Sequence, residues 1–371
     1  MTEHKNTYGK ITLTALDALR AGQLKIHGRY EVLEGGAISC DFTACGISFR
    51  ADCAGEVRVT VSVRKPFVDL TAYATDHGYF TVWVDGVRRD SAVRGGGTAA
   101  VKLCGVRAAG TEQSLLLAAG LPAGEHEFTL LKQSDPHMNV ACIHSLTLCG
   151  TLLDPPAPKP RLIEFIGDSL TAGFGNLGLP DTGSFDADYQ DGTQTYAFFA
   201  AEALGADARI IARAGIGLRY CSTYTQKPMS EVWHLRSYWR SEETEYVPAR
   251  VPDLVVVNLF ANDRTKIKSE KFPDATCEGY AAAMRHFLGE LREFYPGVPI
   301  LVLDHPCAYE PLSRTAAGVA AEFDGVTVRP YERFRTGYSN HPNTASNRTQ
   351  AEVLVGQIRE LYPELFGAEI F

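Results

Sequence analysis

Two patterns of apolar and polar residues divide the chain, and one replaces the other near residue 155. Between residues 29 and 148, apolar and polar positions alternate in short runs separated by glycine-rich turns. This alternation is typical of half-buried β-strands. We expect strands at Arg29–Leu33, Ala37–Phe42, Gly46–Ala51, Val57–Val63, Tyr79–Val84, Ala99–Leu103, Ser114–Ala118, His126–Lys132 and Val140–Leu148. Many short strands at this spacing predict an antiparallel sandwich of the jelly-roll type over residues 1–153.

Turn residues set the boundaries of these strands. Asp85-Gly86 follows an apolar strand pattern and predicts a tight hairpin. Glu34-Gly35-Gly36, Gly95-Gly96-Gly97 and Pro122-Ala123-Gly124 predict further turns. Lys10–Gln23 is weakly patterned, and we expect either a short helix or an irregular lead-in there.

After the strand-rich region, the segment 154–160 reads DPPAPKP. Four prolines in seven residues continue neither a sheet nor a helix, because proline lacks an N–H and has a fixed φ. We therefore expect a stiff linker between two domains.

Beyond the linker, short apolar runs alternate with amphipathic stretches over residues 161–371. The predicted strands are Leu162–Ile166, Ala208–Ala212, Leu254–Leu259, Ile300–Leu303 and Val326–Arg329. The predicted helices are Thr195–Leu204, Glu278–Tyr295, Thr315–Phe323 and Thr344–Tyr362. This alternation predicts a five-stranded parallel sheet with helices on both faces, an α/β/α sandwich. The chain length of 371 residues also favours two domains.

Composition narrows the classes of partner. The net charge of −8 and the lack of any basic run disfavour nucleic acids and anionic membranes as partners. No apolar stretch approaches membrane-spanning length, and the polar N-terminus lacks the apolar core of a signal peptide, so we expect a cytoplasmic location. The nine cysteines form no C-x-x-C pair, which favours reduced core thiols and predicts neither a metal site nor a cofactor.

Ser169 is the first candidate for chemistry. It stands in Gly167-Asp168-Ser169-Leu170, directly after the first predicted strand of the parallel sheet. Open α/β sheets bind their ligands at the carboxyl ends of strands, so a serine here is placed as a nucleophile would be. A serine that only caps the N-terminus of a helix would give the same short pattern.

Two further candidates follow the next two strands. Gly215 comes after the second strand, where a glycine lets a backbone N–H approach a ligand closely, and Gly217 is the alternative for that role. Asn262 comes after the third strand, and its amide can donate to an oxyanion. A plain turn at Gly215 and a helix cap at Asn262 remain open readings.

A base is needed to take the proton of a serine nucleophile, and histidine titrates near the working pH. His341, in Ser-Asn-His-Pro-Asn before the last helix, is the main candidate. His305 also follows a strand, in Asp-His-Pro, and is its competitor.

The ordered blocks Gly167-Asp168-Ser169-Leu170, Gly215, Asn262-Asp263 and His341-Pro342 resemble those of the SGNH, or GDSL, hydrolases, whose fold is a flavodoxin-like α/β/α sandwich. The upstream segments YFTVWVDG and LPAGEHEFTLLK extend the resemblance to carbohydrate esterase family 2, in which a jelly-roll domain precedes the SGNH domain. The resemblance covers most of residues 27–371.

This resemblance implies a role for each block. Ser169 is the implied nucleophile and His341 the implied base. The N–H groups of Ser169 and Gly215 and the side chain of Asn262 are the implied oxyanion donors. Members of the family remove acetyl groups from sugar hydroxyls, so the implied partner is an acetylated oligo- or polysaccharide.

The chain departs from the family pattern at two positions. Phe260 stands where the third block usually begins with glycine, which would narrow the acyl pocket or shift the Asn262 loop. Tyr338 stands three residues before His341, where these enzymes commonly carry an aspartate. Some members of the esterase family orient the histidine with a main-chain carbonyl instead, so we predict a Ser–His dyad.

Several other side chains are candidates for substrate contact. Asp168, Phe260 and Asp263 flank the predicted catalytic blocks. Trp233, Tyr238 and Trp239 lie in a long polar insertion and are candidates for stacking on sugars. Packing of the insertion against the domain is the favoured explanation for at least two of the three. Trp83 is expected to belong to the sandwich core.

The leading hypothesis is therefore a serine acetylesterase acting on carbohydrate. An SGNH esterase for short-chain lipid or aryl esters is the first alternative. A carbohydrate-binding protein with a decayed active site is the second, and Phe260 and Tyr338 are the residues that favour it. The sequence does not predict the oligomeric state.

Overall fold

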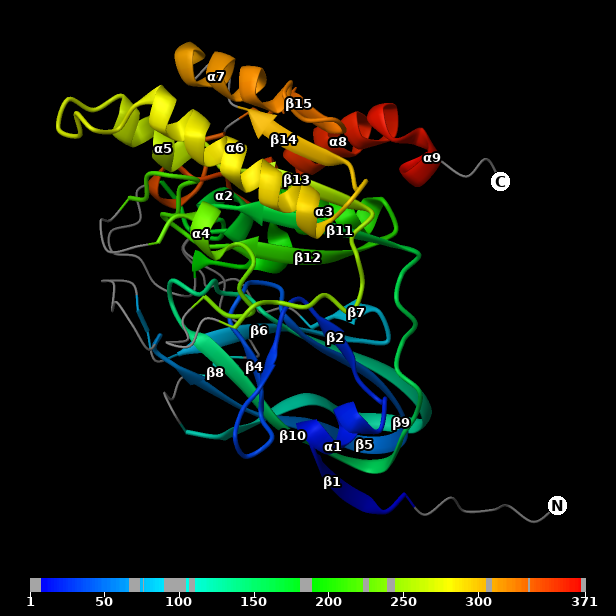
Figure 1. Ribbon diagram of the computed structural model, residues 1–371. Helices are drawn as coiled ribbons and strands as arrows, with labels where there is room; N and C mark the ends of the chain where they lie inside the picture. The colour runs from blue at the N-terminus through cyan, green and yellow to red at the C-terminus, as the bar shows by residue number, and fades with distance from the viewer. Residues whose placement is uncertain are drawn as a thin grey trace.

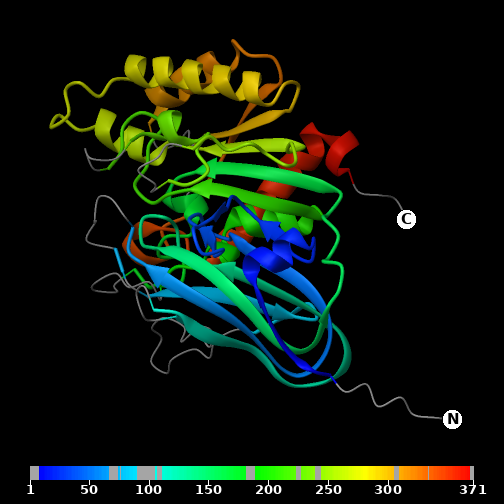
Figure 2. The ribbon, with the colours of Figure 1, turned by 60° about the horizontal axis from the view of Figure 1, so that its bottom comes forward.

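The computed structural model describes residues 8–66, 74–75, 77–89, 105–106, 111–180, 189–222, 227–238, 244–304, 309–332 and 334–367. A β-sandwich forms the lower half of the molecule in Figure 1, and an α/β domain forms the upper half. Figure 2 shows the same two parts from below, with the strands of the sandwich in front. The predicted strand Ala99–Leu103 and the turn Gly95–Gly97 lie outside the described residues.

The sandwich is antiparallel. Its elements are β1 (Lys10–Thr14), α1 (Ala15–Arg20), β2 (Lys25–His27), β3 (Glu31–Val32), β4 (Ile38–Cys40), β5 (Gly46–Arg64), β6 (Gly78–Val84), β7 (Val87–Arg88), β8 (Gly105–Val106), β9 (Gln113–Lys132) and β10 (Val140–Leu152). The strand order along the main path is β3-β4-β10-β5-β9-β6-β7. The predicted hairpin at Asp85-Gly86 is confirmed, since it joins β6 to the antiparallel β7 with both residues at positive φ.

Two pairs of predicted strands are in fact single long strands. β5 runs without a break through both Gly46–Ala51 and Val57–Val63, and β9 runs through the predicted turn at Pro122–Gly124. Their mutual register shifts between Cys53 and Val57, which marks β-bulges. Bulges bend a strand without ending its pairing, so the glycines there produce a shared bend and not a turn.

The lead-in also differs from its prediction. Lys10–Thr14 forms strand β1 along β10, and the helix that follows is only Ala15–Arg20. The predicted strand Arg29–Leu33 is reduced to β3, and Arg29 before it contacts the other domain.

The five-stranded parallel sheet is confirmed. It consists of β11 (Arg161–Gly167), β12 (Ala206–Ala212), β13 (Leu254–Asn258), β14 (Ile300–Asp304) and β15 (Val326–Pro330). The strand order is β12-β11-β13-β14-β15. The chain therefore reverses its direction of progress across the sheet beside β11, and ligands of such sheets bind at that switch point.

Helices cover both faces of this sheet. The helices are α2 (Ser169–Ala172), α3 (Tyr196–Ala203), α4 (Met229–Val232), α5 (Ala261–Ile267), α6 (Cys277–Phe294), α7 (Glu310–Ala320), α8 (Thr344–Leu361) and α9 (Pro363–Phe366), with short 3-10 turns at Gly192–Gln194 and Tyr338–Asn340. α6 and α7 pack on one face, and α3 and α8 on the other (Figure 1). None of the described helices is long and apolar enough to cross a membrane.

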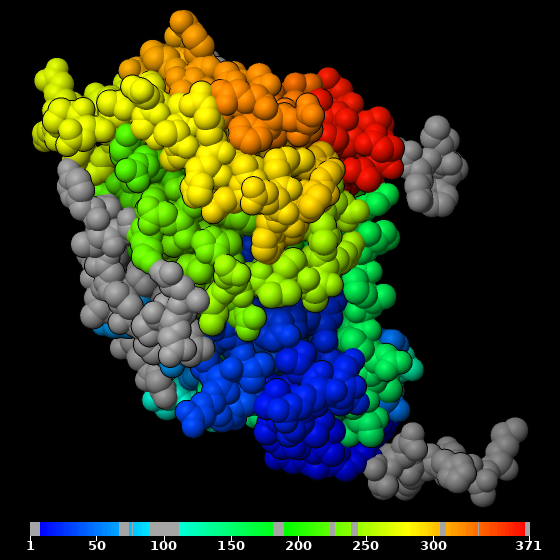
Figure 3. Space-filling view, in the orientation of Figure 1, coloured from blue at the N-terminus to red at the C-terminus, as the bar shows by residue number. Residues whose placement is uncertain are grey.

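A buried ionic network joins the domains, which pack directly against each other (Figure 3). Arg29 of the sandwich donates to the carbonyls of Trp233 and Leu235, each at 2.5 Å. Its guanidinium also lies 3.7 Å from Glu164 of β11, whose other oxygen pairs with Arg209 of β12. Burying charges costs free energy unless they are paired, and here the carboxylate of Glu164 pairs with two buried arginines, Arg29 and Arg209.

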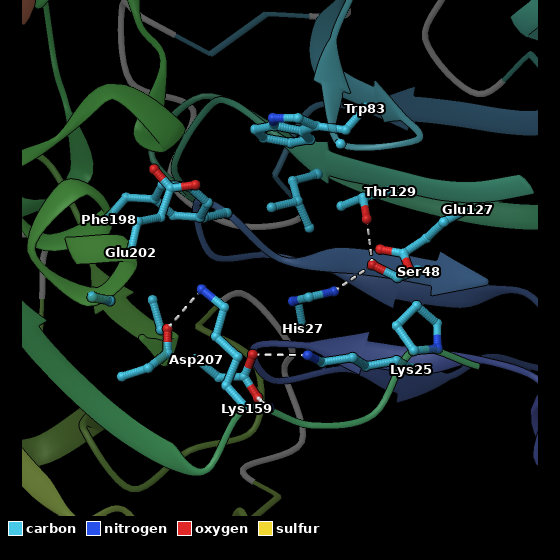
Figure 4. Close-up of a pocket in the computed structure, with 17 residues that line it drawn as sticks. Lys25, His27, Ser48, Trp83, Glu127, Thr129, Lys159, Phe198, Glu202 and Asp207 are labelled. Atoms are coloured by element: carbon cyan, nitrogen blue, oxygen red, sulfur yellow. Dashed lines mark hydrogen bonds and ion pairs between the residues drawn. The ribbon is translucent and has the colours of Figure 1, made fainter. Parts of the chain in front are cut away.

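A cavity of about 340 Å³ also lies between the domains. Figure 4 shows the Lys25–Asp207 ion pair on one of its sides and Trp83 on another. Trp83 is half-buried and stacks on Phe198 of α3, with ring centroids 6.2 Å apart, so its prediction as a core residue of the sandwich was wrong. Asp207 stands at the start of β12, so this cavity is at the edge of the sheet opposite to Ser169.

We predict that Arg29→Ala lowers the free energy of unfolding by about 3–5 kcal/mol, because it leaves the buried Glu164 with one partner fewer. Arg50→Ala is the control: Arg50 pairs with Glu125 at 2.5 Å but is 37% exposed, so we expect a loss below about 1 kcal/mol. Urea denaturation measures both. Equal losses in the two variants would contradict the importance of the buried network.

Candidate active site

Ser169 lies at the junction of β11 and α2. β11 ends at Gly167, and Asp168 caps the short helix by accepting the N–H of Leu170 at 2.9 Å. Ser169 is therefore the first helical residue, and the capping residue is Asp168. A Cβ on Gly167 would lie 2.0 Å from Oγ1 of Thr171, so glycine is required for this close turn.

The loop after β12, residues 213–222, brings Gly215 to the same edge of the sheet. Gly167 and Ala212 are register partners at the ends of β11 and β12. Gly215 has φ +79°, which favours glycine, and it is half-buried. Gly217, the alternative, is buried, and a Cβ there would lie 2.2 Å from the carbonyl oxygen of Tyr220. Packing alone therefore accounts for Gly217.

Asn262 joins the two loops. It lies in the first turn of α5, a helix that the sequence analysis did not predict, directly beyond β13. Its Nδ2 donates to the carbonyl of Ile216 at 2.7 Å and lies 3.5 Å from Oδ2 of Asp168. An amide carries two N–H donors: one holds the 213–222 loop, and the other serves an oxyanion only when it leaves its long contact with Asp168.

His341 faces Ser169. Its Nε2 lies 2.8 Å from Oγ of Ser169, although the two residues are 172 positions apart in the chain. On the other side of the ring, Nδ1 lies 3.0 Å from the carbonyl oxygen of Ser339 and 3.3 Å from that of Tyr338. A nucleophile bonded to a base that is itself oriented by a third group is the arrangement that serine catalysis requires.

The backbone before His341 is unusual. Ser339 and Asn340 have φ of 51° and 61°, in the left-handed region that residues with a side chain seldom occupy. The chain is held there by three N–H bonds: Tyr338 donates to Gly175, and Thr336 and Gly337 donate to the carbonyl of His341. This turn directs two carbonyls at Nδ1, so the strained backbone and the orientation of the histidine have the same cause.

Tyr338, found where an aspartate is common in the family, packs by its side chain beside the histidine loop. Its ring lies 6.0 Å from both Phe174 and Tyr189 by centroid. A Cβ on Gly175 or Gly178 would approach Cβ of Tyr338 to 2.9 or 2.8 Å. These glycines therefore make room for the tyrosine, and Phe174 continues the contact to the His341 ring at 5.1 Å.

Asp263 holds the far end of the 213–222 loop. Its carboxylate is fully buried and accepts the N–H groups of Leu218, Arg219 and Tyr220 at 2.7 to 2.8 Å. Burial raises the pKa of Asp263 to about 7, although the three N–H bonds oppose that rise. Asp263 thus anchors the loop that carries Gly215.

The structure corrects most of the expected substrate contacts. Asp168 and Asp263 are 0% exposed, Trp233 1% and Phe260 2%, so none of them offers a surface to a sugar. Trp233 packs between Phe287 and Phe294 and donates to Glu290 at 2.9 Å, and so belongs to the core. The sequence of the polar insertion does not predict this burial, because the residues that cover Trp233 belong to α6, more than 50 positions further along the chain. Trp239 and His305 lie outside the described residues.

Tyr238 and the cysteines take packing roles. Arg213 lies over the Tyr238 ring at 4.7 Å. The seven described cysteines are free thiols. Within the described ranges, no group of three or more His, Cys, Asp or Glu side chains is placed to hold a metal ion.

The sequence analysis missed one residue at this site, Asp135 of the sandwich. Its buried carboxylate accepts the N–H of Ala214, next to Gly215, at 2.6 Å. It lies in SDPHMN between two strands and belongs to no catalytic block, so only the packing of the two domains reveals its position.

Comparison with known families identifies the class of protein. The family model of the GDSL-like lipases/acylhydrolases matches residues 163–361, more than half of the chain. The chain therefore belongs to this family of serine ester hydrolases, which confirms the resemblance found in the sequence. The matched region contains Ser169, Gly215, Asn262 and His341.

Individual relatives extend the likeness to the sandwich. The cellulase/esterase CelE of Acetivibrio thermocellus is 28% identical over an alignment of 269 positions, which covers 67% of this chain and 32% of CelE. A family two carbohydrate esterase from Clostridium thermocellum, solved with cellohexaose, superposes with a TM-score of 0.77 at 22% identity, covering 92% of this chain and 99% of that one. The acetyl xylan esterase Est2A from Butyrivibrio proteoclasticus gives 0.77 at 17% identity, covering 96% and 99%. The two-domain fold is thus shared with family 2 carbohydrate esterases.

We predict that Asp263 makes stability depend on pH. Its pKa in the folded chain, about 7, exceeds the ordinary value of 3.8 that it regains on unfolding. The unfolded chain therefore loses this proton first, and the folded state loses relative stability as the pH rises from about 4 to 7. The stability of the wild type minus that of Asp263→Asn should fall by up to about 1.4 kcal/mol per pH unit in this window.

Urea denaturation of both proteins at pH 4, 5, 6 and 7 measures this difference. A difference that stays constant, or that grows with pH, would contradict the raised pKa. Asp263→Asn should also be less stable than wild type at pH 7, because an amide has one oxygen to accept three N–H groups.

Proposed function

We propose that this protein is a carbohydrate O-acetylesterase that works through a Ser169–His341 dyad. The observation that carries the proposal is the 2.8 Å contact between Nε2 of His341 and Oγ of Ser169 at the switch point of the sheet. Gly215 and Asn262 lie on the two neighbouring strand ends, where oxyanion donors are needed.

The reaction follows from this geometry. Oγ of Ser169 attacks the acetyl carbonyl while His341 takes its proton. The N–H groups of Ser169 and Gly215 and Nδ2 of Asn262 bind the oxyanion of the tetrahedral intermediate. His341 then protonates the leaving sugar oxygen, and water, activated by the same histidine, releases acetate from the acyl-enzyme.

In this proposal, main-chain carbonyls replace the usual aspartate. The N–H at Nδ1 donates to Ser339, with Tyr338 as the longer partner, which fixes the tautomer that leaves Nε2 free to accept the serine proton. A carbonyl carries no full charge, so it stabilises the imidazolium less than a carboxylate would. The hydrogen-bonded turn at Ser339 and Asn340 offsets part of this loss by keeping the ring in position.

The substrate class rests on the relatives. The C. thermocellum enzyme is solved with cellohexaose, and Est2A is an acetyl xylan esterase. We extend this to an acetylated oligo- or polysaccharide for the present chain, which spans about a third of CelE. Phe260 does not line an acyl pocket, because its ring is buried in the same apolar cluster as Ile216 and Leu218. The expectation that its ring narrows the pocket by direct contact therefore has no support.

We predict that Ser169→Ala and His341→Ala each lower kcat for an acetyl ester by about 10⁴-fold or more, and that the double variant loses little beyond either single one. Removing either residue of the dyad already abolishes its function, so removing the second adds little further loss of kcat. Ser114→Ala, at an exposed serine of β9, is the control and should keep wild-type activity. Full activity in Ser169→Ala would refute the mechanism, and a carboxylate bonded to Nδ1 of His341 in a crystal structure would refute the dyad.

The acyl preference is a separate prediction. For a series of esters of one alcohol, kcat/KM should be at least about tenfold higher for acetyl than for butyryl, because each unaccommodated methylene costs about 1–3 kcal/mol. Measuring kcat/KM on sugars that carry one acetyl group at a known position then identifies the sugar hydroxyl from which the enzyme removes acetyl. A preference for longer acyl chains would favour a lipid or aryl esterase, and glycan binding without turnover would favour a decayed site.

A further inference from the structure

Asp135 makes a contact across the domain boundary that the proposed reaction does not yet use. It lies between β9 and β10 of the sandwich and is 0% exposed. Oδ2 accepts the N–H of Ala214 at 2.6 Å, and Oδ1 accepts the N–H of His137 in its own loop at 3.1 Å. One carboxylate thus ties a loop of the sandwich to the loop that follows β12.

The contact falls directly beside a proposed oxyanion donor. Ala214 precedes Gly215, so fixing the Ala214 N–H fixes the peptide plane next to the one that carries the Gly215 N–H. Gly215 has φ +79° and its own carbonyl accepts the N–H of Ser222 at 2.8 Å. Glycine is the residue with the widest choice of backbone conformations, so its N–H keeps one direction only if its neighbours are held.

The charge of Asp135 is offset locally. Burial raises the pKa of this carboxylate, while the Ala214 N–H and the cations of Lys132 and Arg213 oppose that rise. Lys132 and Arg213 are themselves buried. A negative group beside an oxyanion hole would otherwise weaken the hole, and these cations reduce that effect.

We infer that Asp135 is a positioning residue for the oxyanion hole and that the sandwich takes part in catalysis through it. This inference rests on the proposed function. The 213–222 loop is then held by a carboxylate at each end: Asp135 from the sandwich at Ala214, and Asp263 from α5 at Leu218 to Tyr220. Preorganised donors bind a developing oxyanion without reorganisation during the reaction, which is the benefit of holding both ends.

The chain supplies a matched control at the other end of the same strand. Asp207 begins β12 and also links the domains, accepting from Lys25 at 2.8 Å and from the N–H of Lys159 in the linker at 3.0 Å (Figure 4). Asp207→Asn therefore removes an interdomain carboxylate of the same kind, at the edge of the sheet away from Ser169. A loss of domain docking alone would affect both variants alike.

The test compares full-length wild type, Asp135→Asn and Asp207→Asn in three measurements. These are kcat and KM for an acetyl ester, the melting temperature, and the rate at which a p-nitrophenyl methylphosphonate modifies Ser169. The phosphonate forms a tetrahedral adduct whose oxygen needs the oxyanion donors. We expect Asp135→Asn to lower kcat and the phosphonylation rate by about 10- to 100-fold with KM within about twofold, since loss of a whole donor costs about 10²–10³.

Asp207→Asn should keep both rates within about twofold of wild type even if its melting temperature falls. The inference is overturned if Asp135→Asn reacts like wild type per folded molecule, or if Asp207→Asn loses as much. Should Asp135→Asn fail to fold, Asp135→Ser, whose hydroxyl can still accept one N–H, is judged by the same criteria. If the wild type is neither active nor phosphonylated at Ser169, the proposed function fails and the inference fails with it; if only the Asp135 effect is missing, the proposed function stands.

Discussion

The parallel pairing of β12, β11 and β13 is the constraint on which the site depends. Because the three strands run in the same direction and lie side by side, the loops that follow them must meet at one edge of the sheet. Those loops carry Ser169, Gly215 and Asn262. The fourth residue, His341, arrives from the loop before α8 and meets Ser169 at 2.8 Å. The sheet thus gathers three of the four groups, and the loop before α8 adds the fourth.

Buried carboxylates hold the loops after the strands in place by accepting their backbone N–H groups. Asp168 caps α2 behind Ser169, Asp263 binds three N–H groups of the 213–222 loop, and Asp135 binds a fourth from the sandwich. Each replaces water as the partner of backbone N–H groups that irregular loops leave unsatisfied. The energetic cost of burying charge is visible in the raised pKa values of Asp263 and Asp135. The loops after β11 and β12 are thereby held by buried hydrogen bonds in addition to their strands.

The same reasoning gives the sandwich a place in the enzyme. Its Arg29 enters the α/β domain to pair with Glu164, and its Asp135 reaches the loop beside Gly215. The first contact reaches the interior of the sheet, and the second reaches the loop that follows β12. Buried polar contacts therefore join the sandwich to the α/β domain, in addition to the covalent linker.

The sequence by itself determined the parallel sheet and the residues at its strand ends. Both follow from local signals, since apolar runs such as LVVVNL mark buried strands, and Gly167, Gly215 and Asn262 stand directly after such runs. Tertiary structure alone decided what lies beside these residues. Trp233 and Phe260 proved to be core, β5 proved to be one bent strand, and Asp135 proved to touch Ala214. Burial, bending and contact between domains depend on partners far away in the chain, and no local pattern of residue types encodes them.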